Sequence, residues 1–296
     1  FFASGKNQKL QNEYHTNFKI SSAGEKLYLS NQQGVVDQFN PFSLDDDVSA
    51  GRIKDNETQK LSVPTPGSEN ILYNNELSFS KESGCYQNAF ELQIDASELD
   101  TIFYSLDGSL PAGSGKILEG PLYIKSIDDL SLSISIIPNT PTQKEIAFKA
   151  WELPSGALPQ LHTLRFQSYK NGQPTSPVYT QVYLIGHSFT EWFEIPVISI
   201  VTDKQGLHDE TDGIFVPGID FDASDPEWTG NYFRKGWDSE RAISISYFDN
   251  NQLLFSQNAG LRINGQKTRQ ATQKSLRILA RPKYGEGVIQ HKLIPE

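Results

Sequence analysis

The clearest strand pattern in the sequence is AGLRING, residues 259–265, in which apolar and polar side chains alternate. A polar, basic loop of seven residues follows over 266–272, and QKSLRIL, residues 273–279, alternates again, which predicts a β-hairpin. Because successive strand side chains point to opposite faces, Lys274 is expected on the face of Leu276 and Ile278. An amine leaving a largely apolar face requires an anion, unless the side chain extends past Ile278 to water, as strand lysines commonly do. The pattern alone leaves both interpretations open.

Short runs of the same kind occur along the whole chain. They predict a hairpin from EKLYLS (25–30), a turn at 31–34 and VVDQF (35–39), and further strands at FELQI (90–94), TIFYS (101–105) and the β-branched EIPVISIV (194–201). Aromatic residues make up 11% of the sequence, and Gly, Pro, Asn and Asp cluster between the runs, as in sheets joined by turns. We therefore expect a mainly β protein.

The length of 296 residues exceeds what one hydrophobic core usually organises, so we expect more than one domain. Two prolines in SVPTPGSEN, residues 62–70, forbid a central strand there and indicate a linker. The predicted modules are residues 1–70, 71–190 and 191–296.

Composition disfavours several classes of function. The net charge of −10 argues against non-specific binding to nucleic acid or to anionic lipid, since both partners are polyanions. The sequence contains no run of about 18 apolar residues, so no transmembrane segment is expected. Cys85 is the only cysteine, and the five histidines lack H-x-H or H-E-x-x-H spacing, which disfavours disulfides, a zinc site and a Cys-His nucleophile.

Charge changes sign toward the end of the sequence. Residues 203–240 hold ten acidic and three basic residues, a local charge of about −7, whereas residues 251–296 hold eight basic and two acidic residues, about +6. In the acidic stretch, DFDASD spaces Asp220, Asp222 and Asp225 in a way that suits Ca²⁺ ligands. The glycine and terminal glutamate of an EF-hand loop are missing, so we favour a solvated acidic loop over a calcium site.

Five motifs follow one another in the last module: DGIFVPG (212–218), GNYFRKG (230–236), WDSER (237–241), FSQNAGLRI (255–263) and QKSLR (273–277). Together they resemble the opening of a CotH-type (spore coat protein H) kinase-like domain. The resemblance implies the β-rich N-terminal part of a kinase-like α+β fold that binds ATP with Mg²⁺ or Mn²⁺. It assigns Arg262, Arg269 and Lys274 to the phosphate-binding side of the nucleotide site, with Gly265 at the turn, where a backbone approaches phosphate most easily.

Two earlier stretches resemble immunoglobulin-like β-sandwich modules of bacterial surface proteins. HTNFKI (15–20), GEKLYL (24–29), DVSAGR (47–52) and PTPG (64–67) resemble the C-terminal portion of a lamin-tail domain. IFYSLDGSLP (102–111), EGPL (119–122) and PTSPVYT (174–180) resemble the C-terminal domain of chitobiase and β-hexosaminidase. Neither resemblance implies catalytic groups.

The resemblances imply a secreted or cell-surface bacterial protein. The intact protein is expected to be an atypical protein kinase that phosphorylates surface or secreted proteins. The metal-binding acidic residues of that family lie downstream of the stretch matched here, so the chain by itself is expected to be inactive, with no catalytic residue of its own. The alternative is a non-catalytic adhesion or glycan-associated module whose partner is a cell-wall or host glycan.

Overall fold

The computed structural model describes residues 3–10, 13–21, 23–40, 43–44, 49–53, 57–61, 69–111, 115–127, 136–145, 149–153, 160–281, 283–285, 287–289 and 291–292. Strands arranged in several sheets dominate these residues, which confirms the prediction of a mainly β protein. The chain divides into two compact units, residues 1–72 and 73–296, and each is described by itself.

Unit 1 consists of antiparallel strand pairs. The pairs are β1 (Gln8–Leu10) with β2 (Glu13–His15), β3 (Leu27–Asn31) with β4 (Gly34–Phe39), and β5 (Ser49–Arg52) with β6 (Thr58–Leu61). The pair of β3 and β4 confirms the hairpin predicted over residues 25–39. Leu61 is the only hydrophobic side chain that is buried in the described part of this unit, so its hydrophobic core is small.

The first sheet of unit 2 has the strand order β12-β11-β14-β16-β8, with β15 paired to β14. All pairs are antiparallel except β16 with β8. Two smaller antiparallel pairs, β7 with β10 and β9 with β13, contribute to the same hydrophobic core as this sheet. The strands are β7 (Leu77–Phe79), β8 (Gly84–Tyr86), β9 (Phe90–Leu92), β10 (Ile94–Ala96), β11 (Thr101–Ser105), β12 (Lys116–Ile117), β13 (Leu122–Ile124), β14 (His162–Lys170), β15 (Gln173–Pro174) and β16 (Tyr179–Ile185).

The second sheet of unit 2 is fully antiparallel, in the order β17-β18-β19-β20. Its strands are β17 (Val197–Val201), β18 (Arg241–Asp249), β19 (Gln252–Ile263) and β20 (Leu276–Leu279). Short helices fill its connections: α1 (Lys204–His208) and the 3-10 turns η1 (Phe189–Glu191), η2 (Asn231–Phe233), η3 (Trp237–Ser239) and η4 (Lys267–Gln270). Ile243, Ile245, Ala259 and Leu261 form the core of this part.

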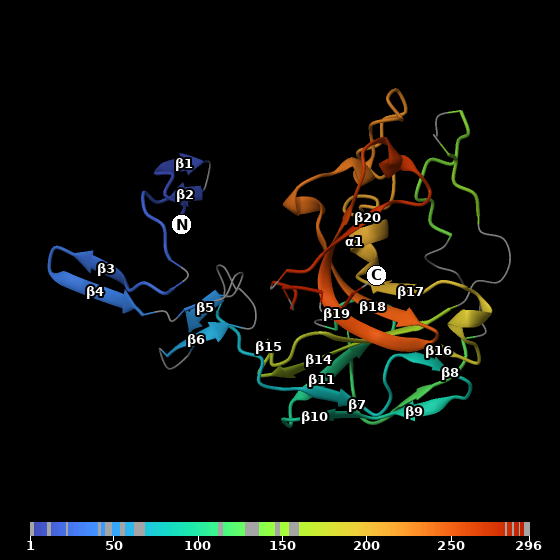
Figure 1. Ribbon diagram of the computed structural model, residues 1–296, viewed down its shortest axis with the longest axis horizontal. Coiled ribbons are helices and arrows are strands. Elements are labelled where there is room, and N and C mark those ends of the chain that lie inside the picture. The colour runs from blue at the N-terminus through green and yellow to red at the C-terminus, as the bar shows by residue number, and fades with distance from the viewer. Residues whose placement is uncertain are drawn as a thin grey trace. The chain divides into compact units, whose positions relative to one another are not determined.

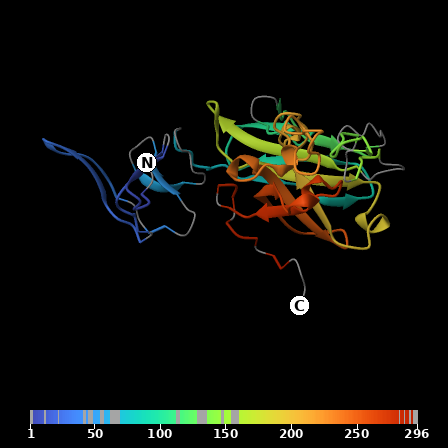
Figure 2. The same cartoon turned by 90° about the horizontal axis from the view of Figure 1, so that it is seen from above.

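Strand β16 joins the two sheets because both of its faces are buried. Tyr183 and Ile185 point into the core of the first sheet, whereas Val182 and Leu184 pack with Val201 and Phe248 of the second sheet. Such a strand reads as a continuous apolar run, which VYLI at residues 182–185 provides. Unit 2 is therefore layered, with the first sheet between the second sheet and the smaller strand pairs (Figure 1, Figure 2). The segments predicted as separate modules, 71–190 and 191–296, lie within this one unit.

Among the described residues, no helix is long and apolar enough to cross a membrane.

Candidate functional site

The hairpin that carries the predicted site is present, but its second strand is shorter than predicted. Strands β19 and β20 pair antiparallel, with Leu261 opposite Ile278 and Ile263 opposite Leu276. Between them the chain winds through η4, and β20 begins only at Leu276, so Lys274 precedes the strand. The expectation that Lys274 shares a strand face with Leu276 and Ile278 is therefore wrong, because the turn extends further into the sequence than the alternation indicates.

The Lys274 amine points into this turn. Its Nζ donates hydrogen bonds to the carbonyl oxygens of Arg269 (2.8 Å) and Ala271 (3.1 Å), and lies 4.1 Å from the ring centroid of Tyr232. Tyr232 belongs to η2 and is fully buried. Burial lowers the pKa of the Lys274 amine to about 7. The amine thus does not extend to open water, and its partners in the described chain are carbonyl oxygens and the Tyr232 ring.

Arg269 is the second cation of the turn, and it is buried, with 8% of its surface exposed, whereas Lys274 is half-buried. Its Nε donates to the carbonyl of Gly265 (2.7 Å), and its Nη1 donates to the carbonyls of Tyr232 (3.2 Å) and Arg234 (3.1 Å). Burial lowers the pKa of its guanidinium. In the described part of the chain, neither Arg269 nor Lys274 has a carboxylate partner.

Gly265 allows the turn to close in this way. Its φ is +96°, in the region that favours glycine, and a Cβ there would lie 2.3 Å from Oγ1 of Thr268. The structure therefore brings three of the four predicted phosphate-site residues together: Gly265, Arg269 and Lys274. Arg269 and Lys274 are the two cations of this turn.

Arg262, the fourth predicted residue, lies in a different cluster. Its Nε donates to the carboxylate of Glu240 at 2.7 Å, and Glu240 also accepts from Lys283 Nζ (2.9 Å) and Tyr284 Oη (2.9 Å). Arg281 forms an ion pair with it, with Nε 3.2 Å from the carboxylate. The Glu240 side chain has no exposed surface. Burial acts to raise the pKa of its carboxyl, but the hydrogen bonds from Lys283, Tyr284 and Arg262 outweigh it and hold that pKa below its usual value.

An exposed indole covers these cations. The ring centroid of Trp237 lies 5.2 Å from Arg262, 4.3 Å from Arg281 and 4.9 Å from Lys283, and 63% of the Trp237 surface is exposed. We call the group the Glu240 cluster; its members are Trp237, Glu240, Arg262, Arg281, Lys283 and Tyr284. Three cations face one carboxylate, so the cluster carries a net charge of +2.

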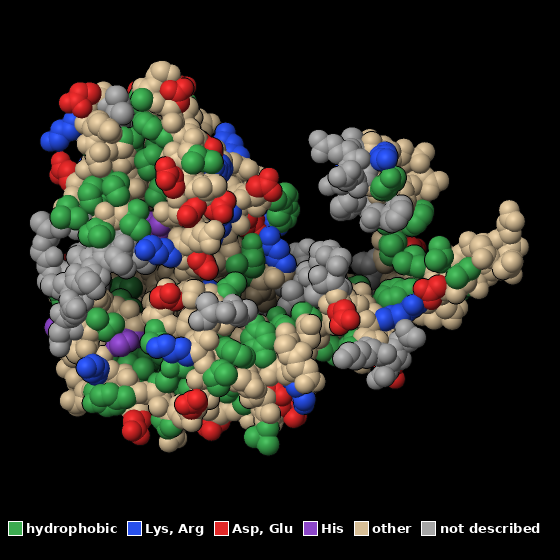
Figure 3. Space-filling model, turned by 180° about the vertical axis from the view of Figure 1, so that it is seen from behind, with side chains coloured by type: hydrophobic (Ala, Val, Ile, Leu, Met, Phe, Trp, Pro, Cys, Tyr) green, Lys and Arg blue, Asp and Glu red, His purple; other side chains and the backbone are tan. Residues whose placement is uncertain are grey.

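The sequence analysis did not predict this cluster, although the change in the sign of the local charge was a signal for it. The acidic stretch and the basic stretch pair with each other in space, through the Glu240 cluster and through Lys267 and Glu227, which are 2.7 Å apart. On the face shown in Figure 3, acidic and basic side chains of unit 2 lie intermixed among hydrophobic ones. The opposite local charges of the two segments were the signal from which these contacts could have been inferred.

The acidic loop proposed as a weak calcium candidate uses its carboxylates within the chain. Asp220 pairs with Arg234 at 2.7 Å, and Asp222 accepts hydrogen bonds from the backbone and hydroxyl of Ser224. Residues 220–225 are all described, and no group of three or more His, Cys, Asp or Glu that could hold a metal occurs among the residues the structure describes. Asp225 is exposed and contributes its backbone to a turn with Asp222.

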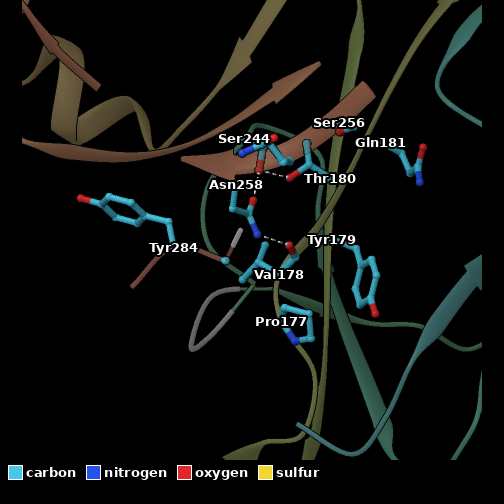
Figure 4. Close-up of a pocket in the computed structure, with 11 residues that line it drawn as sticks. Pro177, Val178, Tyr179, Thr180, Gln181, Ser244, Ser256, Asn258 and Tyr284 are labelled. Atoms are coloured by element: carbon cyan, nitrogen blue, oxygen red, sulfur yellow. Dashed lines mark hydrogen bonds between the residues drawn. The ribbon is translucent and has the colours of Figure 1, made fainter. Parts of the chain in front are cut away.

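A second feature of unit 2 is a groove where β16 meets β18 and β19 (Figure 4). It encloses about 380 Å³ and is lined by neutral residues. Hydrogen bonds across it link the two sheets: Thr180 Oγ1 with Ser244 Oγ (2.7 Å), Ser244 Oγ with Asn258 Oδ1 (2.6 Å), and Asn258 Nδ2 with the Val178 carbonyl (3.0 Å). Tyr284 lines this groove and also belongs to the Glu240 cluster, so the two features are contiguous.

Compared with models of protein families, with curated proteins and with solved structures, the chain matches none of them.

Proposed function

We propose that the chain supplies the phosphate-binding side of a CotH-type kinase-like domain. In this proposal the intact protein is an atypical protein kinase that transfers a phosphoryl group from ATP, with Mg²⁺ or Mn²⁺, to surface or secreted proteins. One observation supports it most: two cations, the buried Arg269 and the half-buried Lys274, lie at one turn and have carbonyl oxygens and the Tyr232 ring, but no carboxylate, as partners in the described chain.

A buried cation without a counter-ion is unfavourable, and a bound anion relieves that cost. Backbone carbonyls compensate only part of the charge, as the lowered pKa of the Lys274 amine, about 7, indicates. A phosphate group arriving at the turn provides the missing negative charge. Lysine and arginine are the residues that neutralise phosphate charge in phosphoryl-transfer sites.

The two cations have different roles in this proposal. Arg269 holds the turn closed through the carbonyls of Gly265, Tyr232 and Arg234, so it positions the backbone. Lys274 moves its amine from the carbonyls of Arg269 and Ala271 to a phosphate oxygen. Arg262 is hydrogen-bonded to Glu240 and stabilises the neighbouring strand, so we do not propose it as a phosphate contact.

The described residues fit a polyphosphate better than they fit a divalent metal. The turn offers cations, and no acidic group able to hold a metal occurs in the described ranges. A bound metal ion neutralises developing charge on the transferred phosphoryl group. In this proposal the residues of this chain bind and orient the nucleotide, and the resemblance places the metal ligands downstream of the matched stretch.

Calorimetric titration of the intact protein with ATP and Mg²⁺ tests the proposal. Lys274→Ala should abolish measurable binding, and Lys125→Ala, which removes an exposed lysine just after β13, should leave the affinity unchanged. Circular dichroism confirms that both variants are folded. Equal affinities for Lys274→Ala and the wild type would overturn the phosphate role of this lysine.

A further inference from the structure

The groove between the two sheets has a lining suited to one kind of ligand. The polar side chains that face it are hydroxyls and one amide (Figure 4), and none of its lining residues carries a charge; the polar ones are Thr180, Ser244, Ser256, Asn258 and Tyr284. Groups of this kind both donate and accept hydrogen bonds, as sugar hydroxyls do. A phosphate requires cations, which the groove lacks, whereas a sugar presents both hydroxyls and apolar C–H faces and so fits a lining that combines hydroxyls with Pro177 and Val178. Its volume of about 380 Å³ lies in the range of ligand sites.

The groove is held in place before any ligand binds. The hydrogen bonds among Thr180, Ser244 and Asn258 fix their rotamers between the sheets. Thr180 and Ser244 are buried. An asparagine side chain has two donors and two acceptor lone pairs, and Asn258 uses one donor and one lone pair in these bonds. Its second donor hydrogen and second lone pair are available to a hydroxyl in the groove.

One end of the groove is positively charged. Tyr284 reaches from the groove to Glu240, and Lys283 Nζ lies 4.6 Å from the Tyr284 ring centroid. Lys283 and Trp237 are both exposed, beside a cluster whose net charge is +2. The single Glu240 carboxylate does not balance the three cations around it, so an anion bound at this end would reduce the repulsion among those cations.

We propose that the groove and the Glu240 cluster together bind an acidic polysaccharide, with neutral sugar hydroxyls in the groove and a uronate carboxylate at Lys283. The indole of Trp237 provides an apolar face against which a sugar ring packs, and the neighbouring cations provide specificity for the carboxylate. The nucleotide site proposed above uses Lys274 and Arg269, so the two sites share no residue.

Retention of the chain on immobilised polygalacturonate tests this proposal. Dextran provides the sugar without the charge, and poly-glutamate provides the charge without the sugar. At physiological salt we expect binding to polygalacturonate that is at least about tenfold tighter than binding to either control, because both halves of the site are used. The fluorescence of Trp237 should change on binding, and the Trp237→Phe variant should lose that change.

Four variants separate the site from the rest of the protein. Lys283→Ala and Asn258→Ala should each weaken retention by roughly fivefold or more, since each removes one polar contact. Lys125→Ala, just after β13, and Lys274→Ala, in the nucleotide site, should leave retention unchanged. Thermal melts establish that all four variants are folded.

Three results would overturn the proposal: no retention on polygalacturonate, equal retention on poly-glutamate, or equal retention of the Lys283→Ala and Asn258→Ala variants and the wild type. Equal retention on poly-glutamate would mean that the cluster attracts any polyanion and that the groove takes no sugar. Because Lys274→Ala tests only the nucleotide site, failure of one proposal is distinguishable from failure of the other.

Discussion

The carboxylate of Glu240 lies 2.7 Å from Nε of Arg262, and this contact ties the acidic stretch of the chain to its basic stretch. Glu240 follows η3 directly, and Arg262 lies in β19, twenty-two positions later. Because the carboxylate is buried, pairs with three cations and accepts a hydrogen bond from a tyrosine, it holds several segments of the second sheet together.

Removing the charge of Glu240 should destabilise unit 2. Glu240→Gln leaves three cations around a neutral side chain, and we expect a loss of roughly 2–3 kcal/mol in the free energy of unfolding, measured in urea. The value is below that of a fully buried pair because Arg262, Arg281 and Lys283 are 20–36% exposed. The matched control is Glu227→Gln, which breaks an exposed pair with Lys267 and should cost less than about 1 kcal/mol. Equal losses for the two variants would contradict this role of Glu240.

The same carboxyl predicts a pH dependence. Its pKa is lower in the folded protein than the ordinary value of 4.5, so its contribution is fully present above that pH. The contribution is lost as the pH falls through the folded-state pKa, because the folded protein must then take up a proton that the unfolded chain already holds. The difference in stability between the wild type and Glu240→Gln should therefore shrink as the pH is lowered below about 4.5. Urea melts between neutral pH and pH 3 measure it, and a constant difference would argue against a lowered pKa.

Gly260 should tolerate no side chain. A Cβ at this position of β19 would lie 2.6 Å from the Tyr284 ring and 3.0 Å from Oε1 of Glu240. We expect Gly260→Ala to cost about 1–3 kcal/mol, because the Glu240 cluster must shift to make room. Gly120→Ala is the matched control: nothing lies within 4 Å of a Cβ there, so its effect should stay within about 0.5 kcal/mol. If Gly260→Ala left the stability unchanged, Tyr284 and Glu240 would have to be loosely held.

The two sheets of unit 2 should unfold together, since β16 is buried between them. Leu184 is 2% exposed and packs toward the second sheet, so Leu184→Ala should cost about 3 kcal/mol. The whole of unit 2 should then melt in one transition at a lower temperature. Hydrogen exchange measured in both sheets checks this, and protection lost in the first sheet alone would show that the sheets are independent.

The strands were predictable from the sequence because apolar and polar side chains alternate along strands that have one buried face. The hairpin of β3 and β4 and the pairing of β19 with β20 follow from that pattern. The packing of the two sheets was not predictable, because a run such as VYLI indicates a buried strand without indicating what covers each face.

Only part of the candidate site could be predicted. Arg269 and Lys274 were identified, but alternation extended the strand to residue 273 and gave Lys274 a strand face. The 3-10 turn η4 instead directs its amine to the carbonyls of Arg269 and Ala271. Tyr232 and Glu240 come from distant segments, so only the folded chain shows that one lies under Lys274 and the other holds Arg262.

The pKa of the Lys274 amine, followed by NMR in the intact protein with and without ATP, tests the central claim most directly. Without nucleotide, burial should place this pKa at about 7. A phosphate at the amine stabilises its protonated form, so ATP should raise the pKa by at least about one unit, which corresponds to ~1.4 kcal/mol. A pKa that stays unchanged in saturating ATP would show that the nucleotide phosphates do not bind at this turn.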